Sequence, residues 1–136
     1  MNYVNLWADS KEDAEGKSPQ NFLTGIDAYN FITEARQRSD KVGTPSNNKL
    51  SLQSFYYISK IKFADYVHKI SPRAMLYLAA TTDVLTGPIE GHKKVFEKAG
   101  EPKEFVTLNN HHIAQYFGNS FEENVSAQIE FLKRRP

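Results

Sequence analysis

Two short apolar runs, separated by a segment of helix length, constrain the fold of this chain more than any other feature. RAMLYLAATTD (73–83) has the length of a buried strand, and KEFVTL (103–108) predicts a second one. Between them, Pro88 occupies a first-turn position in PIEGHKKVFEKAG, whose apolar residues share one helical face, and Gly100 is placed to end that helix. The pattern predicts a β-α-β unit with two parallel strands and a right-handed crossover.

Helical patterns flank this unit on both sides. Downstream, Ser120 and Glu123 have the spacing of a capping box, and basic residues at 133–135 suit the C-terminal end of a last helix. Upstream, one helix is predicted from Asp27 to about Arg38, and another over 51–69, with a break near Lys62. The segment 38–49 is rich in turn residues and predicts a surface loop, and residues 1–25 predict a loop or extension.

Composition and charge leave a narrow set of protein classes. The 136 residues, 40% of them hydrophobic, predict one globular domain at most, and 17 basic against 16 acidic residues give no field that would favour nucleic acid or an anionic membrane. No cysteine is present, so disulfides and thiolate nucleophiles are excluded. Without an apolar leader or a run of membrane-spanning length in the sequence, we expect a cytoplasmic protein.

Two parallel strands do not form a stable sheet alone, because parallel sheets are normally covered on both faces and extended at their edges. The first 70 residues do not obviously supply neighbouring strands. We therefore expect a partner at the sheet edge, either a second copy of the chain or the N-terminal half of a larger protein.

Candidate catalytic residues follow the two predicted strands. Asp83 ends the first strand run, and His111 and His112 follow the second. In doubly wound sheets, reactive side chains gather just past the carboxyl ends of the strands. An acid after one strand and a histidine after the next have the order of the later members of a Ser, Asp, His triad.

Other roles compete with catalysis at each of these positions. An aspartate after a strand commonly caps a turn, and adjacent histidines in an Asn-rich segment are commonly surface residues. A metal site of Asp83 with His111 or His112 is a third alternative, although the spacing matches no zinc signature. His92 is expected to be a partly exposed helical residue, and His68 has no predicted role.

The sequence also resembles a known family over residues 22–132. The matching stretches are DAYNFI (27–32), residues 48–72, residues 75–117 and FEENVSAQIEFL (121–132). They resemble the C-terminal half of α/β-hydrolases of the dienelactone-hydrolase-like, serine-esterase type. The family motif TDVLTP carries the triad acid, which falls on Asp83. The family motif LPGGHFDPY aligns with LNNHHIAQY (108–116) and places the triad histidine on His112.

The chain departs from this family at three places. Asn109, Asn110 and His111 replace the Pro-Gly-Gly that precedes the family's histidine, and Ala114 replaces a common aspartate. The G-x-S-x-G nucleophile elbow is absent, because the one glycine pair at that spacing, Gly87 and Gly91, has an isoleucine at its centre. An acid and a base without a nucleophile predict no acyl transfer by the chain alone.

These inferences predict a partial α/β-hydrolase fold, with an extension (1–25), a helical cap-like segment (26–70) and a β-α-β-α part (71–136). The predicted function is the C-terminal portion or a subunit of a serine hydrolase acting on esters or related acyl bonds, with Asp83 and His112 as catalytic residues. No cofactor or metal is expected. The alternative is a non-catalytic, hydrolase-derived module for binding or oligomerisation. In the cap-like segment, aromatic residues such as Phe31, Phe55 and Tyr56 are predicted to be core rather than substrate pocket.

Overall fold

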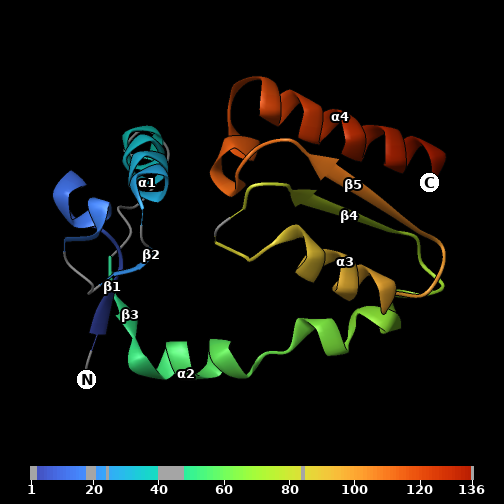
Figure 1. The fold of residues 1–136 in the computed structure, drawn as a ribbon, viewed down its shortest axis with the longest axis horizontal. Coiled ribbons are helices and arrows are strands. Elements are labelled where there is room, and N and C mark those ends of the chain that lie inside the picture. Colours follow the sequence, from blue (N-terminus) through green and yellow to red (C-terminus); the bar gives the residue numbers. More distant parts are fainter. Residues whose placement is uncertain (1–2, 18–20, 24, 40–47, 84, 136) are drawn as a thin grey trace. The chain divides into compact units, whose positions relative to one another are not determined.

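The computed structural model describes residues 3–17, 21–23, 25–39, 48–83 and 85–135 (Figure 1). It divides the chain into two compact units, residues 1–61 and residues 62–136. The division into an extension, a cap-like segment and a hydrolase part remains a prediction.

The first unit has a small three-stranded sheet in the order β2-β1-β3. The central strand β1 pairs with β2 in parallel and with β3 in antiparallel orientation. Its elements, in chain order, are β1 (Tyr3–Trp7), the π-helical turn η1 (Asp13–Lys17), β2 (Asn21–Leu23), α1 (Ile26–Ser39), β3 (Leu50–Ser51) and α2 (Leu52–Lys60). The helix predicted from Asp27 to about Arg38 is confirmed as α1.

The prediction that residues 1–25 form only a loop or extension was wrong, because β1 and β2 lie within them. Their pairing depends on contacts between residues far apart in the sequence. The Asn48 side chain accepts a hydrogen bond from the Trp7 amide (3.0 Å) and donates one to the Trp7 carbonyl (3.0 Å). Asn48 thus satisfies the backbone at the end of β1 as a neighbouring strand would. The loop predicted over 38–49 lies mostly outside the described residues.

The second unit is built on a parallel strand pair with helices on both faces. Its elements, in chain order, are the 3-10 turns η2 (Phe63–Asp65) and η3 (Val67–Ile70), β4 (Met75–Ala80), α3 (Ile89–Glu97), β5 (Lys103–Leu108), the 3-10 turn η4 (His112–Tyr116) and α4 (Gly118–Arg134). The predicted β-α-β-α order and the parallel pairing of its two strands are confirmed.

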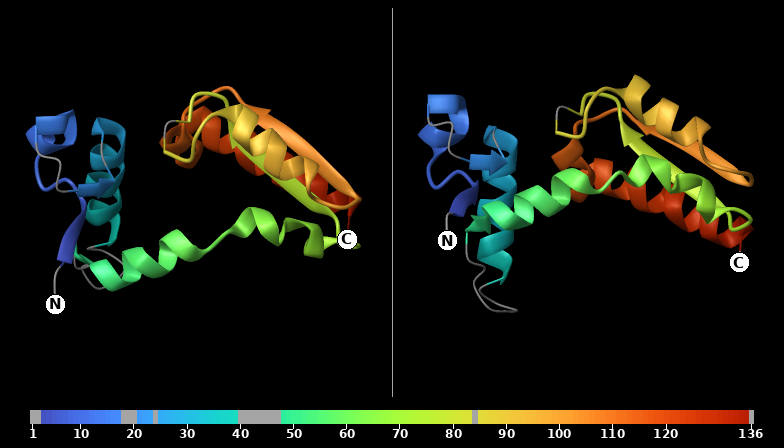
Figure 2. Two further views of the ribbon diagram at one scale, coloured as in Figure 1. Left: turned by 60° about the horizontal axis from the view of Figure 1, so that its bottom comes forward. Right: turned by 90° about the horizontal axis from the view of Figure 1, so that it is seen from below.

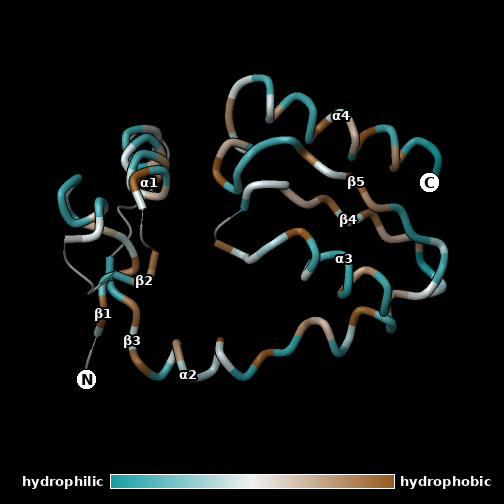
Figure 3. The backbone as a smooth tube through the Cα atoms, in the orientation of Figure 1, coloured by the Kyte–Doolittle hydropathy of each residue, from teal (hydrophilic) through white to brown (hydrophobic). Residues whose placement is uncertain are grey.

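The pairing of β4 with β5 is regular along its whole length, from Met75 opposite Lys103 to Ala80 opposite Leu108. Figures 1 and 2 show α3 and α4 on opposite faces of this pair. Most of β4 lies on the hydrophobic side of the scale in Figure 3, as a strand covered on both faces requires. Within the described residues, the outer edges of β4 and β5 have no strand partner.

Three helix boundaries differ from the prediction. The segment 51–69 breaks near Lys62 as expected, but it continues as 3-10 turns rather than as α-helix. Helix α3 ends at Glu97, before Gly100. The predicted capping box was wrong, because α4 begins at Gly118, so that Ser120 lies inside its first turn, and no side chain caps its start. The Phe117 carbonyl instead accepts the hydrogen bond from the Phe121 amide (3.1 Å).

The core of the second unit lies between β4 and α3. Val67, Met75 and Ala99 are buried there, and three partly buried residues pack against them, namely Tyr77, Val95 and Phe96. Among the helices that the structure describes, none combines the length and the apolar character needed to cross a bilayer.

Candidate functional site

The ends of β4 and β5 bring two short loops together. The ladder continues one step past the strands, where the Thr81 amide donates to the Leu108 carbonyl (2.9 Å). The Thr82 amide then donates to the Asn110 carbonyl (3.1 Å), and the Thr81 hydroxyl donates to the Asn109 side chain (3.2 Å). Asn109 and Asn110 therefore join the two loops. This connection places the residues that follow each strand side by side.

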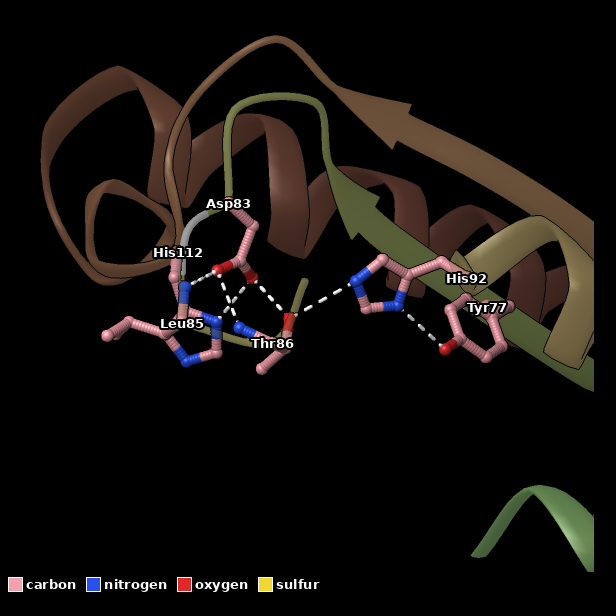
Figure 4. Close-up of polar contacts among 6 residues, drawn as sticks. All are labelled: Tyr77, Asp83, Leu85, Thr86, His92 and His112. Atoms are coloured by element: carbon pink, nitrogen blue, oxygen red, sulfur yellow. Dashed lines mark hydrogen bonds and ion pairs between the residues drawn. The ribbon is translucent and has the colours of Figure 1, made fainter. Parts of the chain in front are cut away.

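Asp83 and His112 meet at this place (Figure 4). The distance between Asp83 Oδ2 and His112 Nδ1 is 2.8 Å. The Asp83 side chain is 3% exposed, whereas His112, the first residue of η4, keeps 31% of its side chain exposed. The structure thus brings together the two residues that the sequence singled out, and it leaves the imidazole accessible from one side.

The second carboxylate oxygen of Asp83, Oδ1, accepts hydrogen bonds from the backbone of the following turn. Oδ1 accepts hydrogen bonds from the Leu85 amide (2.7 Å) and the Thr86 amide (3.1 Å), which is the arrangement of a turn held by an aspartate. The turn-capping role and the pairing with a histidine were alternatives in the sequence. The structure assigns one to each oxygen.

The hydrogen bonds around Asp83 keep it ionised. Burial by itself would raise the pKa of this carboxyl, but the Thr86 hydroxyl and amide, His112 and the Leu85 amide all bond to the charged form and lower its pKa to about 2. Because a carboxylate only accepts hydrogen bonds, His112 Nδ1 must carry the proton between them. Nε2 is then the ring nitrogen that can accept a proton when His112 is neutral.

Sequence reasoning missed the residues that support the pair. The Thr86 hydroxyl donates to Asp83 Oδ2 (2.6 Å), and His92 contacts that hydroxyl through Nε2 (3.2 Å) and Tyr77 through Nδ1 (3.0 Å). The TDVLT sequence could have indicated Thr86, since an aspartate that holds a turn bonds two and three residues ahead. His92 gave no such signal, because it reaches the site from α3.

The structure also places the other two histidines. His111 is the residue before η4, and His68 belongs to η3 and is exposed. No group of three or more His, Cys, Asp or Glu side chains that could hold a metal ion occurs in the part of the chain that the structure describes. Among these residues, a metal ion bound by Asp83 would therefore have at most two neighbouring ligands of these types.

Comparison with known proteins places the chain among larger relatives. No protein-family model matches it. It is 27% identical over 122 residues to polyketide transferase ATR5 from Stachybotrys chlorohalonatus, covering 82% of this chain and 41% of the relative. It is 31% identical over 96 residues to polyketide transferase grgF from Penicillium sp, covering 70% of this chain and 32% of the relative. A polyketide transferase from Gibberella fujikuroi is 29% identical over 97 residues, covering 71% and 30%.

Two solved structures share the fold. The crystal structure of α/β hydrolase GrgF from Penicillium sp. sh18 matches 98% of this chain and 42% of that protein, with a TM-score of 0.64 and 26% identity. The structure of DcsB with its substrate analogue matches 99% of this chain and 44% of that protein, with a TM-score of 0.70 and 20% identity. The chain therefore spans less than half of the relatives that it matches. It has the architecture of part of an α/β-hydrolase and is a distant homologue of fungal polyketide transferases.

Proposed function

We propose that the chain provides the acid and the base of an α/β-hydrolase active site, as the C-terminal portion or a subunit of an enzyme acting on esters or related acyl bonds. The observation that carries this proposal is the 2.8 Å bond between Asp83 and His112 just past the ends of two parallel strands. Active sites of doubly wound sheets are found at this end of the strands.

In this role, His112 Nε2 takes the proton from a nucleophilic hydroxyl as its oxygen attacks the acyl carbonyl carbon. Asp83 stabilises the imidazolium that forms and keeps the ring in the required tautomer. The imidazolium then gives the proton to the leaving group as the bond between the acyl carbon and the leaving group breaks. The low pKa of Asp83, about 2, suits a carboxylate that stays charged throughout this cycle.

The names of the sequence relatives point to a second kind of molecule, besides water, that accepts the acyl group. Because they are called polyketide transferases, the acyl group at this site could pass to an acceptor other than water. In this second step, the same base takes a proton from water or an acceptor hydroxyl as its oxygen attacks the acyl carbon, and the proton passes to the nucleophile's oxygen as the bond between that oxygen and the acyl carbon breaks. A polyketide acyl group is therefore our proposed substrate class, and ester hydrolysis is the simplest assay of the same chemistry.

The nucleophile must come from outside this sequence. We propose that an N-terminal hydrolase half with a G-x-S-x-G elbow, joined to the chain or separate from it, pairs with an open edge of the β4–β5 sheet. Both outer edges are unpaired within the described residues. Parallel sheets of this kind normally have more than two strands.

The test is reconstitution. The chain is co-expressed with an N-terminal hydrolase half that carries the elbow, and hydrolysis of an aryl ester is measured. We expect activity that falls at least about a hundredfold in His112→Ala and in Asp83→Asn, and that persists in the matched control His68→Ala. A reconstituted complex whose rate is unchanged by His112→Ala would overturn the proposal.

A non-catalytic role is favoured by a separate observation, the exposed apolar side chains of the second unit. Phe63 is 76% exposed, Leu132 62% and Tyr66 60%. Exposed apolar surface of this kind marks interaction sites. If the chain serves only for binding or oligomerisation, light scattering will show a dimer or larger assembly, and reconstitution will give no ester hydrolysis. A monomer that becomes active on reconstitution would exclude this alternative.

A further inference from the structure

A chain of hydrogen bonds runs from β4 through α3 to the candidate acid. The Tyr77 hydroxyl lies 3.0 Å from His92 Nδ1, His92 Nε2 lies 3.2 Å from the Thr86 hydroxyl, and this hydroxyl lies 2.6 Å from Asp83 Oδ2 (Figure 4). These contacts connect His92 to the Asp83–His112 pair without a direct contact between the two imidazoles.

The direction of each bond follows from the number of protons available. The Asp83 carboxylate can only accept, so the single hydroxyl proton of Thr86 points to Asp83. Toward His92 the same hydroxyl must accept, which requires a proton on His92 Nε2. In the neutral ring Nδ1 is then unprotonated and accepts from Tyr77. Burial raises the pKa of the Tyr77 hydroxyl, so that it remains a neutral donor.

We propose that His92 and Tyr77 are positioning residues that act through Thr86, orienting its hydroxyl toward Asp83 and so holding the carboxylate against His112. The hydrogen bonds from Tyr77 to His92, from His92 to Thr86 and from Thr86 to Asp83 all point toward the carboxylate. Neighbouring hydrogen bonds that share a direction strengthen one another. The inference deepens the proposed function and rests on it only for the catalytic role of Asp83 and His112.

The packing of Tyr77 and His92 explains how they can fix a loop residue. The Tyr77 ring stacks on Phe105 of β5, with centroids 5.5 Å apart, and contacts the His92 ring edge to face at 5.9 Å. Thr86 is exposed and precedes Gly87, whose φ of 102° turns the chain into α3. Without His92, the Thr86 hydroxyl would have only Asp83 and solvent to orient it.

The first experiment reads the tautomers directly. Long-range ¹H–¹⁵N spectra of the chain, labelled at histidine and recorded with both rings neutral, should show the proton of His92 on Nε2 and that of His112 on Nδ1. A proton on His92 Nδ1 would overturn the proposal, because Nε2 could then not donate to Thr86 and would compete with Asp83 for the single hydroxyl proton. His68 and His111 serve as internal references.

The second experiment measures the acid constant of Asp83 from its carboxyl ¹³C shift. Because the Thr86 hydroxyl bonds to the charged form, Thr86→Val should lower the acid constant about tenfold, and His92→Phe about threefold through the weakened Thr86 bond. His92→Gln replaces the ring by a neutral amide that can still donate to Thr86, and it should stay within about twofold of wild type. If His92→Phe fails to fold, Tyr77→Phe removes one hydroxyl, and the share of His92 with its proton on Nε2 should fall.

The variants separate a hydrogen bond from a charge. If His92→Gln lowers the acid constant as much as His92→Phe, the positive charge of His92 is responsible, and the proposal is wrong. If His92→Phe has no effect, His92 does not act on Asp83. Both measurements use the chain alone, without a nucleophile. They can therefore support the hydrogen-bonded series even when reconstitution yields no enzyme. A failed reconstitution would contradict the proposed function and leave the inference about His92 and Tyr77 standing.

Discussion

The Asp83 site should make the stability of the second unit depend on pH in a defined window. Asp83 has a usual pKa of 3.8 when unfolded and a pKa of about 2 in the folded chain. A lowered folded pKa means that the contribution is complete above the unfolded value and is lost as the pH falls toward 2. The gap between the two values corresponds to about 2 kcal/mol in the free energy of unfolding. The Asp83 side chain is 3% exposed, so solvent screens its interactions little.

The perturbation is Asp83→Asn, which removes the titrating group and keeps the size of the side chain. Urea unfolding is followed by NMR amide signals of β4 and β5, so that the second unit is observed by itself. The stability difference between wild type and Asp83→Asn should shrink by about 2 kcal/mol between pH 6 and pH 2. Asp65→Asn is the matched control, because Asp65 is 57% exposed and 3.9 Å from Lys98, so its ion pair should contribute less than about 0.5 kcal/mol at either pH. A stability difference for Asp83→Asn that stays constant over this range would refute the hydrogen-bond arrangement around Asp83.

Three further substitutions test hydrogen bonds and close packing within each unit, with the free energy of unfolding measured in urea. Lys103→Met should cost about 1–2 kcal/mol, because Lys103 Nζ donates to three carbonyls at the end of α3 at 2.9, 3.0 and 3.3 Å, whereas Lys98→Met should change little. Gly100→Ala should cost about 1–3 kcal/mol, because the added methyl lies 2.7 Å from Ser71 Cβ, whereas Gly91→Ala in open space should stabilise α3 by up to about 1 kcal/mol. Asn48→Ala should cost about 1–2 kcal/mol, read by the fluorescence of the single tryptophan, because Trp7 loses both bonds to Asn48. Equal effects of each variant and its control, or an unchanged Trp7 signal, would contradict these assignments.

The sequence predicted the parts of the fold whose signals are local. The β4, α3 and β5 segments each have a recognisable apolar pattern and residues that mark their ends. Because reactive residues of parallel sheets gather past the carboxyl ends of the strands, these segments also predicted that Asp83 and His112 lie close together. Strand β1 could not be predicted in this way, because it pairs with β3, which comes much later in the sequence, and because its end is bonded by the side chain of Asn48, 41 positions after Trp7. His92 was missed for the same reason, since its partners Tyr77 and Thr86 come from a strand and a loop outside α3.

The start of α4 shows a different limit of sequence reasoning. Ser120 and Glu123 have the spacing of a capping box, but the helix begins at Gly118, separated from the end of η4 by one residue, and its N-cap is Phe117, three residues before Ser120. The path of the chain through η4, which begins at His112, thus decides where α4 starts. A local capping signal cannot overrule a start that tertiary structure imposes.

Under the proposed function, the orientation of the Asp83–His112 pair restricts the direction from which a nucleophile approaches. Nδ1 of His112 is engaged by Asp83, so in that function the hydroxyl approaches Nε2, on the opposite side of the ring. The residues that hydrogen-bond to the pair, Leu85 and Thr86, both belong to the second unit. Under the proposed function, a complementing segment therefore supplies neither member of the acid–base pair. It needs only to bring a hydroxyl within hydrogen-bond distance of Nε2, together with donors for the oxyanion that forms at the acyl group.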